Sequence, residues 1–287
     1  MRSLYPLTNP QQSIWLTEQF GANTNLNNIG GYVCIHEPVV LGALEKAIHI
    51  FIQSNEAMRI HIQLTDDNIP MQYISNADDT VCSIKKTLLP HKEALEAWNK
   101  ALIDTPFSMI DSNLYRFEIF FLPNGLGGFH ISLHHLITDA WGMSLAISQI
   151  MDNYTRVLNL EKVEYTTPNY TDFIASEEKY LSSSKYLKDE EFWNDQFSTS
   201  PELCLVSSKK TNVIDTTAKR EAFTLDENLY YQIDAFCKNY HISVYTFFLA
   251  IYSIYLAKLN NTNTSIIGTP ILNRTDFAQK HTARYVY

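Results

Sequence analysis

The chain lacks a basic tract, and none of its apolar segments is long enough for a confident membrane span. Its formal net charge is −9, so neither nucleic acid nor an anionic membrane surface is expected as its main partner. Residues 1–6 lack the apolar core and the cleavage site of a secretory signal peptide. The most apolar stretch, residues 244–257, carries Thr246 and Ser253 and favours a buried helix instead. The widely spaced cysteines, described next, predict a cytoplasmic protein.

Cysteine is also scarce, with four residues in the whole chain and no Cys-x-x-Cys pair. We expect Cys34, Cys82, Cys204 and Cys237 to be reduced and mostly buried thiols. With 287 residues, of which 45% are hydrophobic, the chain can nevertheless bury a large core. By its length it forms one large domain or two ordinary ones.

Apolar residues recur with the periods of both helices and strands. Helical spacing predicts helices at residues 10–20, 40–51, 94–102, 143–158, 229–237 and 244–258, and a polar helical region at 170–197. Alternation predicts strands at residues 32–35, 58–64, 71–74, 115–121, 128–135, 221–225 and 265–272. The turn residues at 66–68 and 124–125 predict two hairpins. The pattern as a whole predicts an α/β protein with a mixed sheet.

A linker at residues 161–169 divides these elements into two blocks. The first block, residues 1–165, carries most of the predicted strands. The second, residues 166–287, begins with linker helices and offers two strands and two or three helices. These elements are few for completing a mixed sheet layer, so we expect the second lobe to be incomplete in this chain.

Two adjacent histidines end the predicted strand at residues 128–135. Alternation places His135 on the face of Ile131 and places His134 on the opposite face. A histidine at a strand end can face a cleft, and its ordinary pKa of about 6.5 suits proton transfer at neutral pH. His135 is therefore the candidate catalytic residue. Two alternatives are a hydrogen-bonded core histidine and a metal site with His134 and Asp139, for which no third ligand is visible.

Asp139 stands at the start of the next predicted helix, where an aspartate ordinarily caps the backbone. Thr138, just before it, is a second candidate cap. In a mostly apolar region Asp139 can instead hold an arginine in a bidentate ion pair. Arg59 is the candidate partner because it directly precedes the strand predicted around residues 60–64, and the alternative for Arg59 is a solvated charge at a strand end.

The segment at residues 134–140, His-His-Leu-Ile-Thr-Asp-Ala, resembles the His-His-x-x-x-Asp-Gly motif of the condensation domains of nonribosomal peptide synthetases. The wider superfamily similar to chloramphenicol acetyltransferase shares this motif. Further segments resemble the family's other motifs and occur in the same order, at residues 7–16, 55–59, 105–107, 114–117, 170–173 and 267–274. The resemblance covers nearly all of the chain.

This resemblance implies two acetyltransferase-like lobes in a V, with the histidine motif in a tunnel between them. It also implies amide formation, in which an acceptor amine attacks a donor thioester while phosphopantetheine arms of carrier proteins present both substrates. Upstream and downstream carrier proteins and an adjacent adenylation domain are the implied partners, and no bound cofactor or metal is implied. His135 corresponds to the catalytic histidine, which either takes the amine proton or stabilises the tetrahedral intermediate.

The remaining motif residues are implied to support the site. His134 and Asp139 carry over as architectural residues, with Asp139 paired to Arg59. The other expected support residues are Ala140, Trp141 and Gly142, and Asn273 and Arg274 are the expected motif residues of the second lobe.

The chain departs from the family's pattern at three places. Ala140 replaces a glycine, which matters if the backbone there needs a positive φ or a close approach to substrate. Ser108 stands where aspartate is frequent, and residues 283–287 do not resemble the family's continuation. The rival hypotheses are therefore a truncated, non-catalytic remnant or carrier-docking module, and an epimerase or another acyltransferase of the same superfamily.

Overall fold

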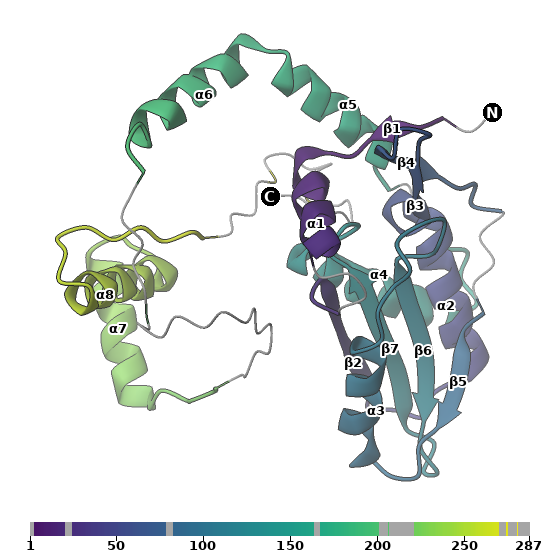
Figure 1. Cartoon of the computed structure of the whole chain (residues 1–287). Coiled ribbons are helices and arrows are strands. Elements are labelled where there is room, and N and C mark those ends of the chain that lie inside the picture. Colours follow the sequence, from purple (N-terminus) through teal and green to yellow (C-terminus); the bar gives the residue numbers. More distant parts are fainter. Residues whose placement is uncertain are drawn as a thin grey trace. The chain divides into compact units, whose positions relative to one another are not determined.

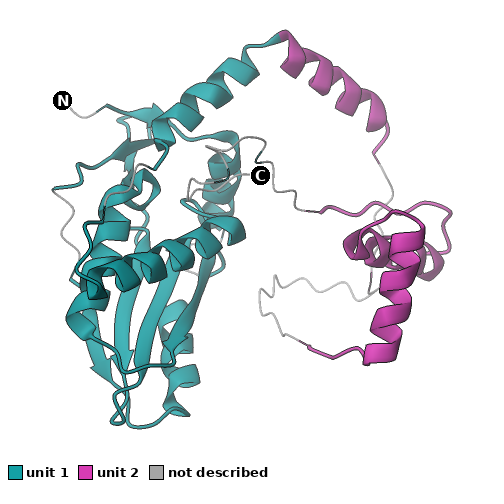
Figure 2. Ribbon diagram, turned by 180° about the vertical axis from the view of Figure 1, so that it is seen from behind, with its two compact units in different colours: residues 1–183, 271–287 teal, residues 184–270 magenta. Residues whose placement is uncertain are grey.

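A computed structural model of the chain describes residues 3–20, 25–78, 83–163, 167–200, 206, 221–269, 274 and 280. The chain forms two compact units (Figure 2). The first unit holds residues 1–183 together with 271–287, and the second holds residues 184–270. The predicted division into lobes at residue 165 remains a prediction.

Two β-sheets build the first unit (Figure 1). The larger sheet has the strand order β2 (Asn28–Ile35), β7 (Gly127–His134), β6 (Tyr115–Phe121) and β5 (Lys85–Leu88). Its β5–β6 pair is parallel, whereas the β2–β7 and β6–β7 pairs are antiparallel. The smaller, antiparallel sheet has the order β1 (Tyr5–Pro6), β4 (Pro70–Ile74) and β3 (Ile60–Leu64). Both predicted hairpins are confirmed, as β3–β4 and β6–β7.

Five α-helices accompany these sheets: α1 (Asn9–Phe20), α2 (Leu41–Ser54), α3 (Ala94–Ile103), α4 (Ala140–Leu158) and α5 (Tyr170–Leu181). A short 3-10 helix, η1 (Glu56–Arg59), leads into β3. Helices α2 and α4 contact each other, and α3 contacts β2 and β7. The helices predicted from residues 10–20, 40–51, 94–102 and 143–158 are therefore confirmed. Strands β1 and β5 were not predicted.

Strand β7 is buried along its whole length, because helices cover both faces of the sheet there. Ile131 on one face belongs to the main hydrophobic core, together with Leu44 and Ile48 of α2 and Ile150 of α4. On the opposite face, the His130 ring lies edge-on to a tryptophan of α3. The predicted alternation of β7 therefore separates an apolar face from a polar one.

The second unit contains α6 (Ser184–Gln196), α7 (Glu227–Asn239) and α8 (Val244–Leu259), in agreement with the predicted helices. The strand predicted at 221–225 is wrong, and residues 265–269 of the strand predicted at 265–272 also form no strand; residues 270–272 lie outside the described residues. Alternation alone does not make a strand, because a strand needs a neighbouring backbone to bond to. No such strand partner exists in the described part of this unit.

Helix α8 is mostly exposed, which contradicts the prediction of a buried helix. Leu256 is buried, but Ile251 and Ile254 are exposed, because α7 is the main helix packed against α8 in this unit. Within the described part of the chain, no single helix is both long and apolar enough to cross a membrane. The α7–α8 pair reaches that length and composition only jointly, with a bend of 99° between the two helices.

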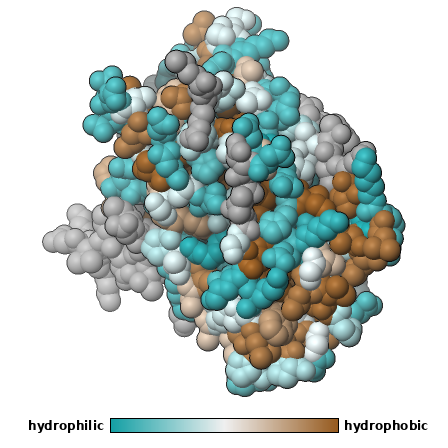
Figure 3. Space-filling model, turned by 90° about the vertical axis from the view of Figure 1, so that its right-hand side faces the viewer, coloured by the Kyte–Doolittle hydropathy of each residue, from teal (hydrophilic) through white to brown (hydrophobic). Residues whose placement is uncertain are grey.

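Figure 3 shows one face of the molecule, on which hydrophobic side chains form patches among hydrophilic ones. Exposed apolar residues of the first unit include Ile69 and Leu88. Because apolar atoms normally make up much of a protein surface, these patches do not by themselves mark a site. Of the four cysteines, Cys237 is a buried free thiol and Cys34 a partly buried one; Cys82 and Cys204 lie outside the described residues.

Candidate active site

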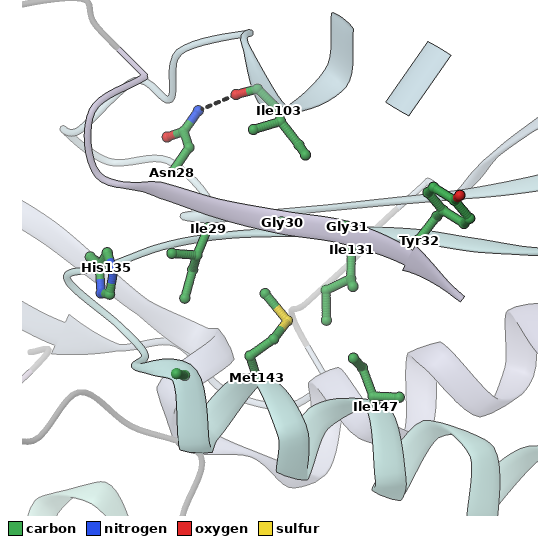
Figure 4. A pocket seen from close by; sticks show the side chains of 11 residues that line it. Asn28, Ile29, Gly30, Gly31, Tyr32, Ile103, Ile131, His135, Met143 and Ile147 are labelled. Carbon is green, nitrogen blue, oxygen red and sulfur yellow. Dashed lines mark hydrogen bonds between the residues drawn. The ribbon is translucent and has the colours of Figure 1, made fainter. Parts of the chain in front are cut away.

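His135 is the first residue after β7 and lines a cleft between β2 and α4 (Figure 4). Its Nδ1 lies 3.2 Å from the carbonyl oxygen of Thr138. Since a carbonyl oxygen can only accept, we assign the proton to Nδ1, which makes Nε2 the basic nitrogen of the neutral ring. The backbone N–H of His135 donates to the carbonyl oxygen of Asn27 at 2.8 Å. Ring and backbone are therefore both held in place.

Burial lowers the pKa of His135, and this effect outweighs the opposing hydrogen bond to the Thr138 carbonyl. The neutral form of the imidazole consequently predominates at pH 7. A neutral imidazole with a basic Nε2 beside a cleft can accept a proton from a bound group.

His134 occupies the opposite environment. Its buried ring donates from Nε2 to Glu18 Oε1 at 3.2 Å, and its Nδ1 accepts from the backbone N–H of Leu136 at 3.1 Å. Asn27 Nδ2 donates to the same Glu18 oxygen at 2.5 Å. Burial raises the pKa of Glu18, but the hydrogen bonds from His134 and Asn27 outweigh it and lower the pKa overall. With both ring nitrogens bonded, His134 is suited to holding the turn rather than to proton transfer.

Helix α1 therefore supports the histidine turn at two points. Besides the Glu18 contact, Gln11 Nε2 donates to the carbonyl oxygen of Leu136 at 3.2 Å and forms a mutual amide pair with Gln72 at 2.9 Å. The prediction from the sequence missed Glu18. The available signal was its spacing, because Glu18 follows Gln11 by seven residues and so lies on the same face of α1.

Asp139 is confirmed as the cap of α4, since its Oδ1 accepts from the backbone N–H of Gly142 at 2.7 Å. Thr138 is not the cap. The carboxylate also binds Arg274, whose Nη2 lies 2.9 Å from both Asp139 oxygens. The Arg274 side chain is fully buried and that of Asp139 is 7% exposed. This buried ion pair ties a residue far along the sequence to the start of α4.

The predicted pairing of Asp139 with Arg59 is wrong. The 3-10 helix η1 directs Arg59 toward the end of β4, where its Nη1 donates to the carbonyl oxygen of Ser75. The Ser75 N–H in turn donates to the Arg59 carbonyl oxygen at 2.9 Å, which fixes this arrangement. Burial lowers the pKa of Arg59. Arg274 thus takes the partner role that the sequence interpretation gave to Arg59.

The remaining predicted support residues differ in their surroundings. Ala140 is the first residue of α4 and does not have a positive φ, so the backbone conformation there does not require glycine. Trp141 is 41% exposed and donates from Nε1 to the carbonyl oxygen of Lys280 at 2.9 Å. Gly142 is buried and supplies the capped N–H. Asn273 lies outside the described residues.

The motif-like segments at residues 55–59 and 170–173 also contact each other. The carboxylate of Glu56 accepts from the backbone N–H groups of Tyr170 and Thr171 at the start of α5. Phe107 lies edge-on to the His134 ring, with 6.1 Å between centroids, and the Arg116 guanidinium lies 4.7 Å from the centre of the Phe107 ring. Segments that are far apart in sequence therefore meet around the first unit's core and the histidine turn.

The cleft beside His135 has a volume of about 600 Å³. The part of the cleft that lies between β2 and α4 is lined by apolar side chains, and His135 lies at one end of it (Figure 4). The side chains of this wall are Ile29, Ile131, Met143 and Ile147. Among the described residues, no three His, Cys, Asp or Glu side chains are grouped so as to hold a metal ion. The arrangement offers a proton acceptor next to a space for an uncharged substrate group.

The mixed sheet and its helices have the chloramphenicol acetyltransferase-like fold, which solved structures share. The first condensation domain of the calcium-dependent antibiotic synthetase matches with a TM-score of 0.85 and 17% identity, over 99% of this chain and 68% of that one. The starter condensation domain of rhizomide synthetase, solved with C8-CoA, matches with a TM-score of 0.85 and 19% identity, over 99% and 64%.

The sequence places the chain more narrowly. The model of the condensation-domain family matches residues 1–285, and the chain belongs to this family. Surfactin synthase subunit 1 of Bacillus subtilis is 31% identical over 97% of this chain and 8% of its own length. The dimodular nonribosomal peptide synthase of the same organism is 22% identical over 94% of this chain and 11% of its own length. The chain thus spans only a small share of these curated relatives.

Proposed function

We propose that this condensation domain forms an amide bond between two carrier-bound substrates. The amine nitrogen of the acceptor attacks the thioester carbonyl of the donor, so that an N–C bond forms and the C–S bond breaks. His135 Nε2 takes the proton that the amine loses and returns it to the departing thiolate. The observation that carries the proposal is the placement of His135, which is held through Nδ1 to the Thr138 carbonyl and lines a cleft of substrate size.

The proton acceptor in this scheme need not be a strong base. A free α-amine has a pKa of about 8 and is already partly neutral near pH 7. His135 therefore contributes by positioning the amine and by stabilising positive charge as the tetrahedral intermediate forms. Because its pKa is lowered, the ring stays neutral, and so able to accept a proton, at pH values below the ordinary histidine pKa.

The other motif residues have positioning roles in this proposal. His134 and Glu18 hold the turn from the α1 side, and Asp139 with Arg274 holds the start of α4. Neither pair lines the cleft. Arg59, bonded at the end of β4, stabilises the first unit away from the reacting atoms.

The partners of the proposed reaction are an upstream and a downstream carrier protein, each with a phosphopantetheine arm, and an adjacent adenylation domain. The relatives' names support this, because they are synthases, one of them a nonribosomal peptide synthase, of which this chain matches one part. The domain binds no cofactor of its own in this scheme, and the reaction is placed in the cytoplasm.

The test supplies one carrier protein loaded with a donor thioester and a second loaded with an aminoacyl acceptor. Mass spectrometry of the acceptor carrier is expected to show the amide product. Absence of product from a chain that is folded by circular dichroism would contradict the proposal. Chiral analysis of the amino acid released from the acceptor identifies an epimerase, which inverts the residue without a change of mass.

A further inference from the structure

Two buried glutamine side chains connect the smaller sheet to the histidine turn. Gln72 lies in β4, the middle strand of that sheet, and is paired with Tyr5 of β1 and with Ile62 of β3. Gln11 lies on α1, and both glutamines are fully buried. Neither is among the described residues that line the cleft. Because buried polar atoms are nearly always hydrogen-bonded, the partners of these amides show what the two side chains hold together.

The two side-chain amides bond to each other and to two backbone carbonyl groups. The Nε2 of each glutamine donates to the Oε1 of the other at 2.9 Å. The Nε2 of Gln72 also donates to the carbonyl oxygen of Pro6 at 2.8 Å. The Nε2 of Gln11 also donates to the carbonyl oxygen of Leu136 at 3.2 Å. The amides therefore form a continuous chain of hydrogen bonds from β1 to the histidine turn.

A side-chain amide suits both positions because it is uncharged and offers two donors and an acceptor. A carboxylate of the same shape would have no donor for the carbonyl oxygens of Pro6 and Leu136. The network also fixes the orientation of the Gln11 amide, whose Oε1 accepts from the backbone N–H of Thr8 at 2.9 Å. The reversed amide would place an oxygen against the Leu136 carbonyl and an N–H group against the Thr8 N–H.

The Leu136 carbonyl is the point at which this chain of hydrogen bonds reaches His135. Leu136 lies within the loop that closes where His135 Nδ1 meets the carbonyl oxygen of Thr138 at 3.2 Å. Residues 136–138 are 1% exposed or less, so water does not reach their peptide groups. A buried carbonyl that loses its donor is costly, so removing the Gln11 amide favours a rotation of the loop that displaces the Thr138 carbonyl.

We propose that Gln72 is a positioning residue for His135. It acts through Gln11, whose bond to the Leu136 carbonyl holds the loop that fixes the imidazole ring. This inference rests on the proposed amide-forming function, in which Nε2 of His135 must meet the acceptor amine. A displacement of about 1 Å at a reacting group can lower the rate about 10²-fold, so a residue outside the cleft can control the chemical step.

The first test is Gln72→Met in the condensation assay, because methionine is unbranched and of similar length but has no amide. We expect the single-turnover rate to fall about 10–100-fold. The concentration of loaded acceptor carrier that gives half the maximal rate should change by less than about twofold, because Gln72 does not line the cleft. In a Gln11→Met background, Gln72→Met should lower the rate by less than about twofold further, because the connection is already broken.

The second test needs no substrate. Nitrogen NMR of the His135 ring distinguishes a protonated ring nitrogen from an unprotonated one and so reports the tautomer. In the parent at pH 7, we expect the tautomer with the proton on Nδ1 to predominate. In Gln72→Met, we expect the two tautomers to mix. If Gln72 contributed to stability alone, its substitution would leave the tautomer of the folded chain unchanged.

Asn153→Leu is the matched control. Asn153 is also a fully buried side-chain amide of the first unit, and its Nδ2 donates to the backbone carbonyl oxygen of Ala47 at 3.1 Å. That bond joins α4 to α2, so Asn153→Leu should lose stability but keep the parent's rate and tautomer. Circular dichroism verifies folding. If Gln72→Met does not fold, Gln72→Asn replaces it, because the shorter amide cannot reach both Pro6 and Gln11.

A folded Gln72 variant with the parent's rate, or with the parent's His135 tautomer, would overturn the inference. An equal rate loss in Asn153→Leu, or a full additional loss in the Gln11→Met background, would also overturn it. The NMR measurement separates this failure from that of the proposed function. A changed tautomer in the Gln72 variant, with no amide product from any chain, would refute the function and leave the positioning of His135 standing.

Discussion

The histidines of β7 and the histidine that directly follows the strand lie in opposite environments. His130 and His134, on the polar face, are buried with both ring nitrogens bonded: His130 to Asn99 at 2.8 Å and to Ser132 at 2.7 Å, and His134 to Glu18 and the Leu136 N–H. His135, past the end of the strand, lines the cleft on the side of Ile131.

The comparison teaches that residue type alone does not mark the reacting group in this segment. A histidine whose two nitrogens are both bonded inside the protein contributes to stability, because breaking those bonds leaves buried polar groups unsatisfied. A histidine that borders a cleft can exchange a proton with a substrate bound there. Substitutions on the bonded side should therefore reduce stability, and those on the cleft side should reduce activity or alter binding.

The largest expected loss of stability comes from Arg274→Ala, which leaves the buried carboxylate of Asp139 without its charged partner. Removal of one member of a buried ion pair costs about 3–5 kcal/mol in the free energy of unfolding. The matched control is Arg156→Ala in α4, whose pair with Asp152 is also 2.9 Å long but about half exposed. That exposed pair should cost about 1 kcal/mol or less. Equal losses in urea unfolding would contradict the assigned role of Arg274.

The second prediction concerns pH and the bonded face. Burial, helped by the charge of Arg116, lowers the pKa of His130 from 6.5 to about 4. The unfolded chain therefore takes up a proton between these values while the folded chain does not, so the free energy of unfolding falls as the pH falls from 6.5 toward 4. The contribution of His130 to this fall is roughly 3 kcal/mol.

Urea unfolding at several pH values tests this prediction. His130→Gln should flatten the dependence across that window, whereas His91→Gln, which alters an exposed histidine, should not. A dependence that remains as steep in His130→Gln as in the parent would show that His130 is not the titrating group.

The third prediction uses Gly30 and Gly31, two neighbouring glycines of β2. Gly30→Ala forces a Cβ against Ser132 and a backbone carbonyl of β7, and such overpacking costs about 1–3 kcal/mol. Gly31→Ala places the same methyl group in open space and should change the free energy of unfolding by about 1 kcal/mol or less, in the stabilising direction. If both substitutions destabilised the chain equally, the cleft would not extend to Gly31.

The smallest expected effect is that of Glu18→Gln. The amide keeps an oxygen that can accept from His134, but it loses the charge that strengthens both hydrogen bonds to Glu18. We expect a loss of about 1 kcal/mol in the free energy of unfolding. Glu177→Gln is the control, because Glu177 is only partly buried where it accepts from the Asn9 N–H, so its substitution should cost less. A larger loss in the control would remove the special role of Glu18.

Local patterns predicted much of the first unit. Alternation located β7 and assigned its two faces, and helical spacing located α2 and α4, because these periods follow directly from burial on one side of an element. Strand β5 escaped prediction because its Lys-Lys-Thr-Leu sequence is mostly exposed and does not alternate. The strands at 221–225 and 265–269 were wrongly predicted because alternation does not supply a pairing partner.

The candidate site was predicted in part. The histidine turn and the capping role of Asp139 followed from short-range spacing. Its ion-pair partner did not, since Arg274 lies 135 residues further along the chain and only tertiary structure selects it over Arg59. The space at Gly31 also had no signal in the sequence, because a glycine in a strand looks the same whether a neighbour or a cavity explains it.

The most direct test of this account measures two quantities on His135→Ala: the single-turnover rate of amide formation between two loaded carrier proteins, and the free energy of unfolding in urea. We expect the rate to fall by about 10²–10⁴-fold, while the free energy of unfolding changes by about 1 kcal/mol or less. A rate close to that of the parent, or a rate loss matched by a large loss of stability, would contradict the assignment of His135 as the catalytic residue.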